Sequence, residues 1–143
     1  MRGNFTVNDT SNGIKANVDW APADPGNTGA LVKFNSAGVF QWMARFELPW
    51  HPSAAFRGIT HGADANIYVA LMALTGTYVS PQNSNVSFTG SMGSYDVLLF
   101  KLASSGSYIT YQRHGGNGWD DINSPVLDSL GYAPCNVHFS YFS

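Results

Sequence analysis

Short apolar or alternating segments run along the chain, with Gly and Pro between them. Such segments are typical of β-strands, and they predict strands at residues 30–34, 39–46, 57–60 and 66–74. A long loop is expected after the last of these strands, through residues 80–85. No segment keeps apolar residues at i, i+3, i+4 and i+7 between helix caps. The pattern therefore predicts an all-β protein with very little helix.

The chain contains an internal repeat. Residues 31–40 align with residues 99–108, and the lysine, serine, glycine and aromatic positions keep register. Each copy indicates a β-hairpin, and the second strand of the later copy covers residues 107–114. Gly38 and Gly106 stand in the connecting turn, where one residue usually needs a positive φ that glycine adopts without steric penalty. A β-branched replacement at either glycine is expected to damage the hairpin.

The repeat extends beyond the hairpin. Residues 64–71 resemble residues 134–141, and residues 3–7 resemble the same strand of a preceding unit. Repeat units then lie at about residues 29–96 and 97–143, with residues 1–28 completing a blade in a single domain. Four strands per unit is the strand number of a β-propeller blade. We therefore expect two four-stranded antiparallel blade-like sheets, in a chain that begins and ends in the middle of a blade.

The repeat also has a characteristic order of features. Residues 93–106 contain a glycine and aspartate lead-in, an apolar strand with a lysine, and a Ser-x-Gly turn. Residues 111–121 contain a strand that ends in Gly-Gly, and an acidic turn follows it. Residues 59–69 supply an apolar strand, an Asp/Gly turn and an Asn-aromatic-Val strand. In this order the features resemble the bacterial SBBP-type β-propeller repeat, and the resemblance covers about residues 29–141.

The resemblance implies a propeller architecture and an extracellular or cell-surface protein used for adhesion or recognition. It carries no catalytic motif to this chain. The first unit departs from the family at residues 47–52, where Glu-Leu-Pro-Trp-His-Pro stands in place of Gly-Gly and the acidic turn. This departure leaves the blade boundaries open.

Two units cannot close a propeller ring, because each blade buries its faces against neighbours on both sides. Three arrangements satisfy this constraint. The chain is a piece of a longer propeller, or subunits of two blades each form a homo-oligomeric ring, or two sheets pack as a β-sandwich. The oligomer would also remove exposed strand edges, so self-association or contact with other propeller units is the expected partnership.

Composition excludes two classes of function. Charged residues make up 11% of the 143 residues, the formal net charge is −2, and no basic run occurs, so we expect no nucleic-acid binding. The apolar stretches at residues 69–74 and 97–100 are far shorter than the roughly 20 residues of a membrane-spanning helix, so we expect no membrane span.

Several features bear on the compartment without deciding it. The chain begins without the apolar stretch of a signal peptide, so we expect that a secretion signal was removed or was never present. The sole cysteine, Cys135, cannot form an internal disulfide. Sequons at Asn4, Asn8 and Asn85 are compatible with a secreted protein and leave glycosylation open.

We expect no enzyme, no metal ion and no cofactor. The four histidines lack the spacing of a metal site, and neither a nucleophile elbow nor a catalytic carboxylate pair stands out. Asp120 and Asp121 follow a glycine-rich loop and offer oxygen donors, but the further acidic residues of a calcium loop are missing. A turn in which they satisfy backbone N–H groups is the simpler interpretation.

The aromatic residues are the most informative about function. Trp50 with His51, and Trp119 with Asp120 and Asp121, occupy loops at equivalent places after the second strand of each unit. Exposed tryptophans beside polar side chains suit stacking against sugar rings, so these five residues are the predicted ligand site. The alternative is that the tryptophans pack between adjacent blades.

The leading hypothesis is therefore a non-catalytic recognition or assembly module whose repeated aromatic loops contact glycans or protein neighbours. The alternative is a purely structural subunit of an extracellular assembly or filament. A hydrolase is the third and weakest hypothesis.

Overall fold

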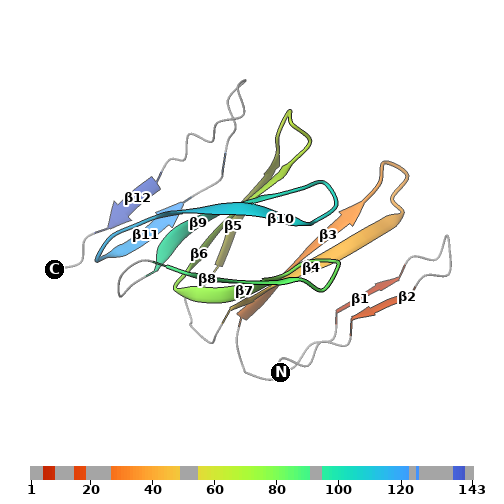
Figure 1. Cartoon of the computed structure of the whole chain (residues 1–143), viewed down its shortest axis with the longest axis horizontal. Helices are drawn as coiled ribbons and strands as arrows, with labels where there is room; N and C mark the ends of the chain where they lie inside the picture. Colours follow the sequence, from red (N-terminus) through yellow and green to blue (C-terminus); the bar gives the residue numbers. More distant parts are fainter. Residues whose placement is uncertain are drawn as a thin grey trace.

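The computed structural model describes residues 5–8, 15–18, 27–48, 55–90, 95–122, 125 and 137–140, and the description below concerns these residues. They form strands and no helix (Figure 1). The strands are β1 (Phe5–Asn8), β2 (Lys15–Val18), β3 (Asn27–Phe34), β4 (Phe40–Leu48), β5 (Ala55–His61), β6 (Ile67–Ala73), β7 (Thr75–Val79), β8 (Asn85–Thr89), β9 (Asp96–Leu102), β10 (Tyr108–His114), β11 (Trp119–Ile122) and β12 (Val137–Ser140).

Two four-stranded antiparallel sheets form the body of the protein. Sheet I has the strand order β3-β4-β7-β8, and sheet II has the order β10-β9-β6-β5. Two further hairpins, β1-β2 and β11-β12, form separate two-stranded sheets. The prediction of an all-β fold with two four-stranded antiparallel sheets is confirmed.

Successive hairpins alternate between the two sheets. The chain places β3-β4 in sheet I, β5-β6 in sheet II, β7-β8 in sheet I and β9-β10 in sheet II. The four strands predicted for the first repeat unit correspond to β3, β4, β5 and β6, and they are thus divided equally between the sheets. An isolated hairpin is at best marginally stable in water, and alternation lets each hairpin bury its apolar face against the opposite sheet.

The segment expected as a long loop differs from the sequence prediction. The stretch expected as a long loop is a tight turn at residues 80–84 between strands β7 and β8. Tyr78 and Phe88 supply the large core side chains of these strands, and both are fully buried. Serine, threonine and asparagine at the other positions are exposed or partly exposed, so both strands have the alternation of a half-buried strand, which the sequence prediction missed.

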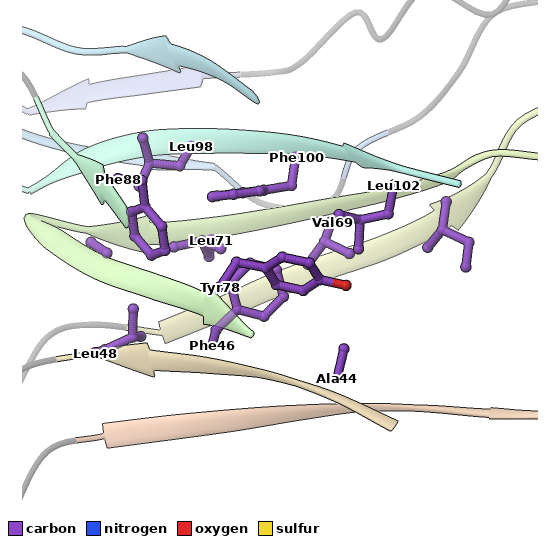
Figure 2. Close-up of a cluster of buried hydrophobic side chains, with 12 residues drawn as sticks. Ala44, Phe46, Leu48, Val69, Leu71, Tyr78, Phe88, Leu98, Phe100 and Leu102 are labelled. Atoms are coloured by element: carbon purple, nitrogen blue, oxygen red, sulfur yellow. The ribbon is translucent and has the colours of Figure 1, made fainter. Parts of the chain in front are cut away.

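The main hydrophobic core lies between the two sheets. Phe46 of β4 and Phe88 of β8 each place their ring centroid 5.0 Å from that of Phe100 of β9, in edge-to-face geometry. Tyr78 and Phe46 approach Phe100 from sheet I in Figure 2. The buried members of this cluster are Ala44, Phe46, Leu48, Ile67, Val69, Leu71, Ala73, Tyr78, Phe88, Leu98, Phe100 and Leu102.

Sheet II is buried on both faces in its two central strands. Every residue of β6 is buried, and β9 is buried except for Lys101. The second face packs against Ile122 of β11, in a cluster with Tyr68, Ala70, Val97 and Leu99. This double burial explains why β6 and β9 read as continuous apolar runs instead of alternating ones.

Four hairpin turns share one backbone geometry. They cover residues 35–39, 62–66, 80–84 and 103–107. In each turn the N–H of the first residue donates to the carbonyl of the fifth, and the N–H of the fourth donates to the carbonyl of the first, at 2.8 to 3.1 Å. The fourth residue has a positive φ in every case: Gly38 (77°), Ala65 (61°), Asn83 (60°) and Gly106 (80°).

The later turn of the sequence repeat contacts strands of sheet I. The side chains of Lys33 and Trp42, in the first hairpin, both donate to the carbonyl of Ser104, at 2.6 and 3.1 Å. The buried hydroxyl of Tyr78 donates to the carbonyl of Gly106. The later turn is thus anchored onto sheet I, whereas Gly38 has nothing within 4 Å of where a Cβ would lie.

The turn geometry predicts different costs at the two repeated glycines. Gly38→Ala should lower the free energy of unfolding by about 1–2 kcal/mol, the conformational cost of a positive φ. Gly106→Ala should cost more, because its Cβ would lie 2.6 Å from Cγ of Pro81. Ala65→Gly should raise stability by up to about 1 kcal/mol, since it relieves the same strain. Urea unfolding of the three variants measures these differences, and equal losses at Gly38 and Gly106 would contradict this account.

The core predicts a large effect at Phe100. Phe100→Ala should lower the free energy of unfolding by about 3–5 kcal/mol, because it removes the ring that both sheets contact. Ile109→Ala on the exposed face of β10 is the control and should change stability by less than about 0.5 kcal/mol. Urea unfolding measures both, and similar losses would show that the inter-sheet contact is not the dominant one.

Candidate functional site

The predicted ligand residues fall into two groups. Trp50 and His51 lie outside the described residues. Trp119, Asp120 and Asp121 lie on β11, which packs on the outer face of sheet II beside β9 and β6 (Figure 1). The candidate site is therefore built on β11.

Alternation along β11 separates the three predicted residues. Trp119 is exposed and Asp121 partly exposed, whereas Asp120 and Ile122 are buried. Successive side chains of a strand point to opposite faces, so Trp119 and Asp121 share the outward face. Asp120 points inward, and only two of the three residues can meet a ligand at the surface.

Trp119 is an exposed aromatic residue with a fixed support. Its side chain keeps 49% of its accessible surface. The ring of Tyr95, which is buried, lies 5.1 Å from the indole at an interplanar angle of 60°. The N–H of Asp120 also donates to the carbonyl of Tyr95 at 3.0 Å. These contacts hold the indole in place while leaving much of its surface open to solvent.

Asp121 brings a charged partner to the outward face. Its Oδ1 lies 2.7 Å from Nε of Arg57 and accepts a hydrogen bond from the N–H of Ile122 at 2.7 Å. Nη2 of Arg57 lies 4.0 Å from Sδ of Met72. Both partners of the ion pair are partly exposed, with 32% and 41% of their side-chain surface accessible to solvent.

Arg57 was missed by sequence reasoning. It belongs to β5, the edge strand of sheet II, and is far from β11 in the sequence. Its only signal was a positive charge within a predicted strand. Only the crossing of β11 over sheet II brings the two residues together.

Asp120 organises the loop before β11. Its Oδ2 accepts a hydrogen bond from the N–H of Gly116 at 2.7 Å. A Cβ at Gly115 would lie 2.1 Å from Oδ1 of Asp96 and 2.7 Å from Oδ2 of Asp120, so two buried carboxyl groups approach one glycine. The sequence interpretation placed Asp120 and Asp121 in a turn, but both lie in strand β11, and only the expected role of satisfying a backbone N–H group agrees with this contact.

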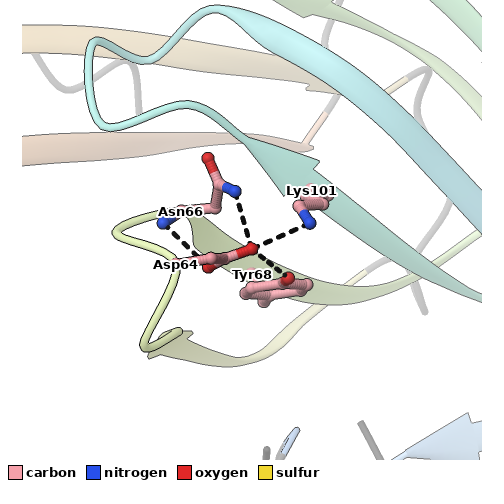
Figure 3. A network of polar contacts seen from close by, with 4 residues as sticks. All are labelled: Asp64, Asn66, Tyr68 and Lys101. Atoms are coloured by element: carbon pink, nitrogen blue, oxygen red, sulfur yellow. Dashed lines mark hydrogen bonds and ion pairs between the residues drawn. The ribbon is translucent and has the colours of Figure 1, made fainter. Parts of the chain in front are cut away.

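A second polar cluster lies at the turn between β5 and β6 (Figure 3). Oδ2 of Asp64 accepts hydrogen bonds from Asn66 Nδ2 at 2.7 Å and the hydroxyl of Tyr68 at 3.0 Å, and it lies 2.8 Å from Nζ of Lys101. Oδ1 accepts from the N–H of Asn66 at 3.1 Å. The ammonium of Lys101 also lies 5.3 Å from the centroid of the Tyr68 ring.

This second cluster is best explained as a support for the turn. Lys101 and the other hydrogen bonds lower the pKa of the Asp64 carboxyl well below its usual value of 3.8, and Asp64 raises the pKa of Lys101. Both oxygens of the carboxylate already have partners, which are Asn66 in the turn, Tyr68 of β6 and Lys101 of β9. The cluster fixes the strained turn at Ala65 and joins it to sheet II.

The structure describes only some of the histidines and does not describe the cysteine. His61 and His114 are exposed, and no group of three or more His, Cys, Asp or Glu among the described residues is arranged to hold a metal ion. The side chains of His51 and His138 and the whole of Cys135 lie outside the described residues. Across those same residues, no helix is long and apolar enough to cross a membrane.

Comparisons of the chain with models of protein families, with curated proteins and with solved structures found no match. The resemblance to SBBP-type repeats therefore stays a prediction from the sequence.

The Asp64 cluster predicts a pH dependence of stability. A carboxyl whose folded pKa is lowered stabilises the fold above its usual pKa, and this contribution is lost as the pH falls through the folded value. Asp64→Asn should therefore lower the free energy of unfolding at neutral pH, and the gap from the unsubstituted protein should shrink below about pH 4. Urea unfolding across pH measures the gap.

A matched control is the exposed ion pair Arg45–Glu47 on sheet I, at 3.0 Å. Glu47→Gln should open a smaller gap, because exposed ion pairs contribute little and Glu47 accepts from Arg45 alone among the described contacts. An Asp64→Asn gap that stays constant down to the acid limit would contradict the assignment.

Proposed function

We propose that the protein is a non-catalytic recognition module that binds carbohydrate at the outward face of β11. The observation that carries the proposal is the exposed indole of Trp119, supported from behind by Tyr95. An indole offers a large flat surface for stacking, and the contact with Tyr95 fixes its orientation before a ligand binds.

The neighbours of Trp119 suit a sugar. The apolar face of a pyranose ring can stack on an indole, while its hydroxyl groups need both donors and acceptors nearby. Asp121 supplies acceptor oxygens and Arg57 supplies donors, and their ion pair at 2.7 Å holds both side chains in position before a ligand arrives. Preorganisation of this kind reduces the entropy lost on binding.

The charges favour binding over cleavage. Glycoside hydrolysis usually needs two carboxyl groups that flank the scissile bond. On β11 only Asp121 faces outward, and it is paired with Arg57, while Asp120 is buried and holds the loop. The resemblance to repeats of adhesion and surface proteins supports the same proposal, with an extracellular or cell-surface location.

A glycan array tests the proposal. The unsubstituted protein should bind a defined set of sugars, and Trp119→Ala should weaken binding by roughly 30-fold, because losing a central aromatic contact costs about 2 kcal/mol. Trp119→Phe should retain part of the affinity. Phe34→Ala is the matched control, since Phe34 is equally exposed (48%) but lies at the end of β3 in sheet I.

The outcomes separate the alternatives. Binding that survives Trp119→Ala unchanged would place the ligand elsewhere. A folded protein that binds no sugar on the array would overturn carbohydrate recognition and favour a structural subunit.

A further inference from the structure

Asn117 and Gly118 stand in the loop between β10 and β11, directly before Trp119. The side chain of Asn117 is exposed, and both residues lie in a bend outside the strands. We infer that Asn117 is a site of spontaneous deamidation, and that this modification changes both the charge and the backbone at the start of β11. The inference goes beyond the proposed function and does not depend on sugar binding.

The local structure leaves the reacting atoms free. Deamidation begins when the backbone nitrogen of the following residue attacks the side-chain carbonyl carbon of asparagine. Gly118 has no Cβ to obstruct that approach. Among the described residues, neither the side-chain amide of Asn117 nor the N–H of Gly118 makes a hydrogen bond. The side chain of Asn117 is therefore exposed, the adjacent Gly118 is partly exposed, and neither reacting group is held by a hydrogen bond among the described residues.

Other asparagines of the described chain lack this combination. Oδ1 of Asn35 accepts hydrogen bonds from the N–H groups of Ala37 and Val39. The side chain of Asn66 donates to Asp64, and the next residue is the β-branched Ile67. The chain has one other Asn-Gly pair, Asn12-Gly13, which lies outside the described residues.

The chemistry needs only water. The Gly118 nitrogen loses its proton and forms a bond to Cγ of Asn117, the C–N bond of the side-chain amide breaks, and ammonia leaves. Water then opens the resulting succinimide at one of its two carbonyls. Opening at one carbonyl gives aspartate, and opening at the other gives isoaspartate, whose main chain is longer by one methylene group.

Both products act on the candidate site. Each adds a negative charge two residues before Trp119 in the sequence, and three and four residues before Asp120 and Asp121. The N–H of Gly116 donates to Oδ2 of Asp120 at 2.7 Å, and residue 117 lies between these two residues. The extra methylene of isoaspartate lengthens the main chain within this hydrogen-bonded loop. Modification at position 117 is therefore expected to loosen the start of β11.

Peptide mapping by mass spectrometry tests the inference. The full-length folded protein is incubated at mildly alkaline pH, where the backbone nitrogen is more readily deprotonated, and isoaspartate is detected with an isoaspartyl methyltransferase. The peptide with residue 117 should gain acid and isoaspartate with time, whereas the peptides with Asn35 and Asn66 should stay unchanged. The peptide with Asn12 is followed separately.

Two variants provide controls. Asn117→Gln should lose the signal at this peptide, because its longer side chain forms the corresponding ring far less readily. Gly118→Ala should slow the reaction, since a Cβ hinders the attack, and Asn117→Ser replaces it as the second control if the alanine variant does not fold. Modification at Asn35 as fast as at Asn117, or an unchanged rate in Gly118→Ala, would overturn the inference.

A comparison of products tests the effect on β11. The Asn117→Asp variant carries the new charge with a normal main chain, whereas the aged protein also contains isoaspartate. The aged protein should have the lower melting temperature of the two. Equal melting temperatures would show that the lengthened main chain does not loosen β11.

Discussion

The packing of aromatic rings from sheet I against Phe100 of sheet II is the interaction on which the structure depends. Phe46 and Phe88 meet this ring at 5.0 Å from two strands of sheet I, and Tyr111 stacks on it from β10 at 5.2 Å. Each sheet consists of hairpins that come from separate parts of the chain, and neither could bury its apolar face alone. Once Phe100 fixes the inner face of β9, the outer face of sheet II is free to receive Ile122 and so to position β11.

Local sequence patterns predicted many of the strands, but they did not predict which strands pair outside their own hairpins. The strands around Gly38 and Gly106 were predictable because glycine marks a turn that needs a positive φ. The same turn at Asn83 has no glycine in its fourth position, and residues 80–85 were interpreted as part of a long loop. The pairing of β4 with β7, and not with β5, depends on how hairpins share apolar surface between sheets, and local alternation holds no information about it.

The candidate site was predictable to a similar extent. Trp119 and Asp121 were predicted because a tryptophan followed by acidic residues stands after the second strand of the repeat unit. Asp120 was placed with them, but the two-residue period of a strand turns its side chain inward to the loop amide of Gly116. Arg57 could not be found, because its place beside Asp121 results from β11 crossing sheet II. The candidate site therefore combines β11, which packs on sheet II through Ile122, with Arg57 from the edge strand β5.

The central claim is that the outward face of β11 binds sugars without changing them. Backbone amide chemical shifts, followed by NMR during titration with soluble oligosaccharides, test it most directly. The account predicts saturable shifts confined to β11, its preceding loop and the neighbourhood of Arg57, with the oligosaccharide recovered intact. Saturable shifts centred on sheet I, or cleavage of the sugar during the titration, would contradict it.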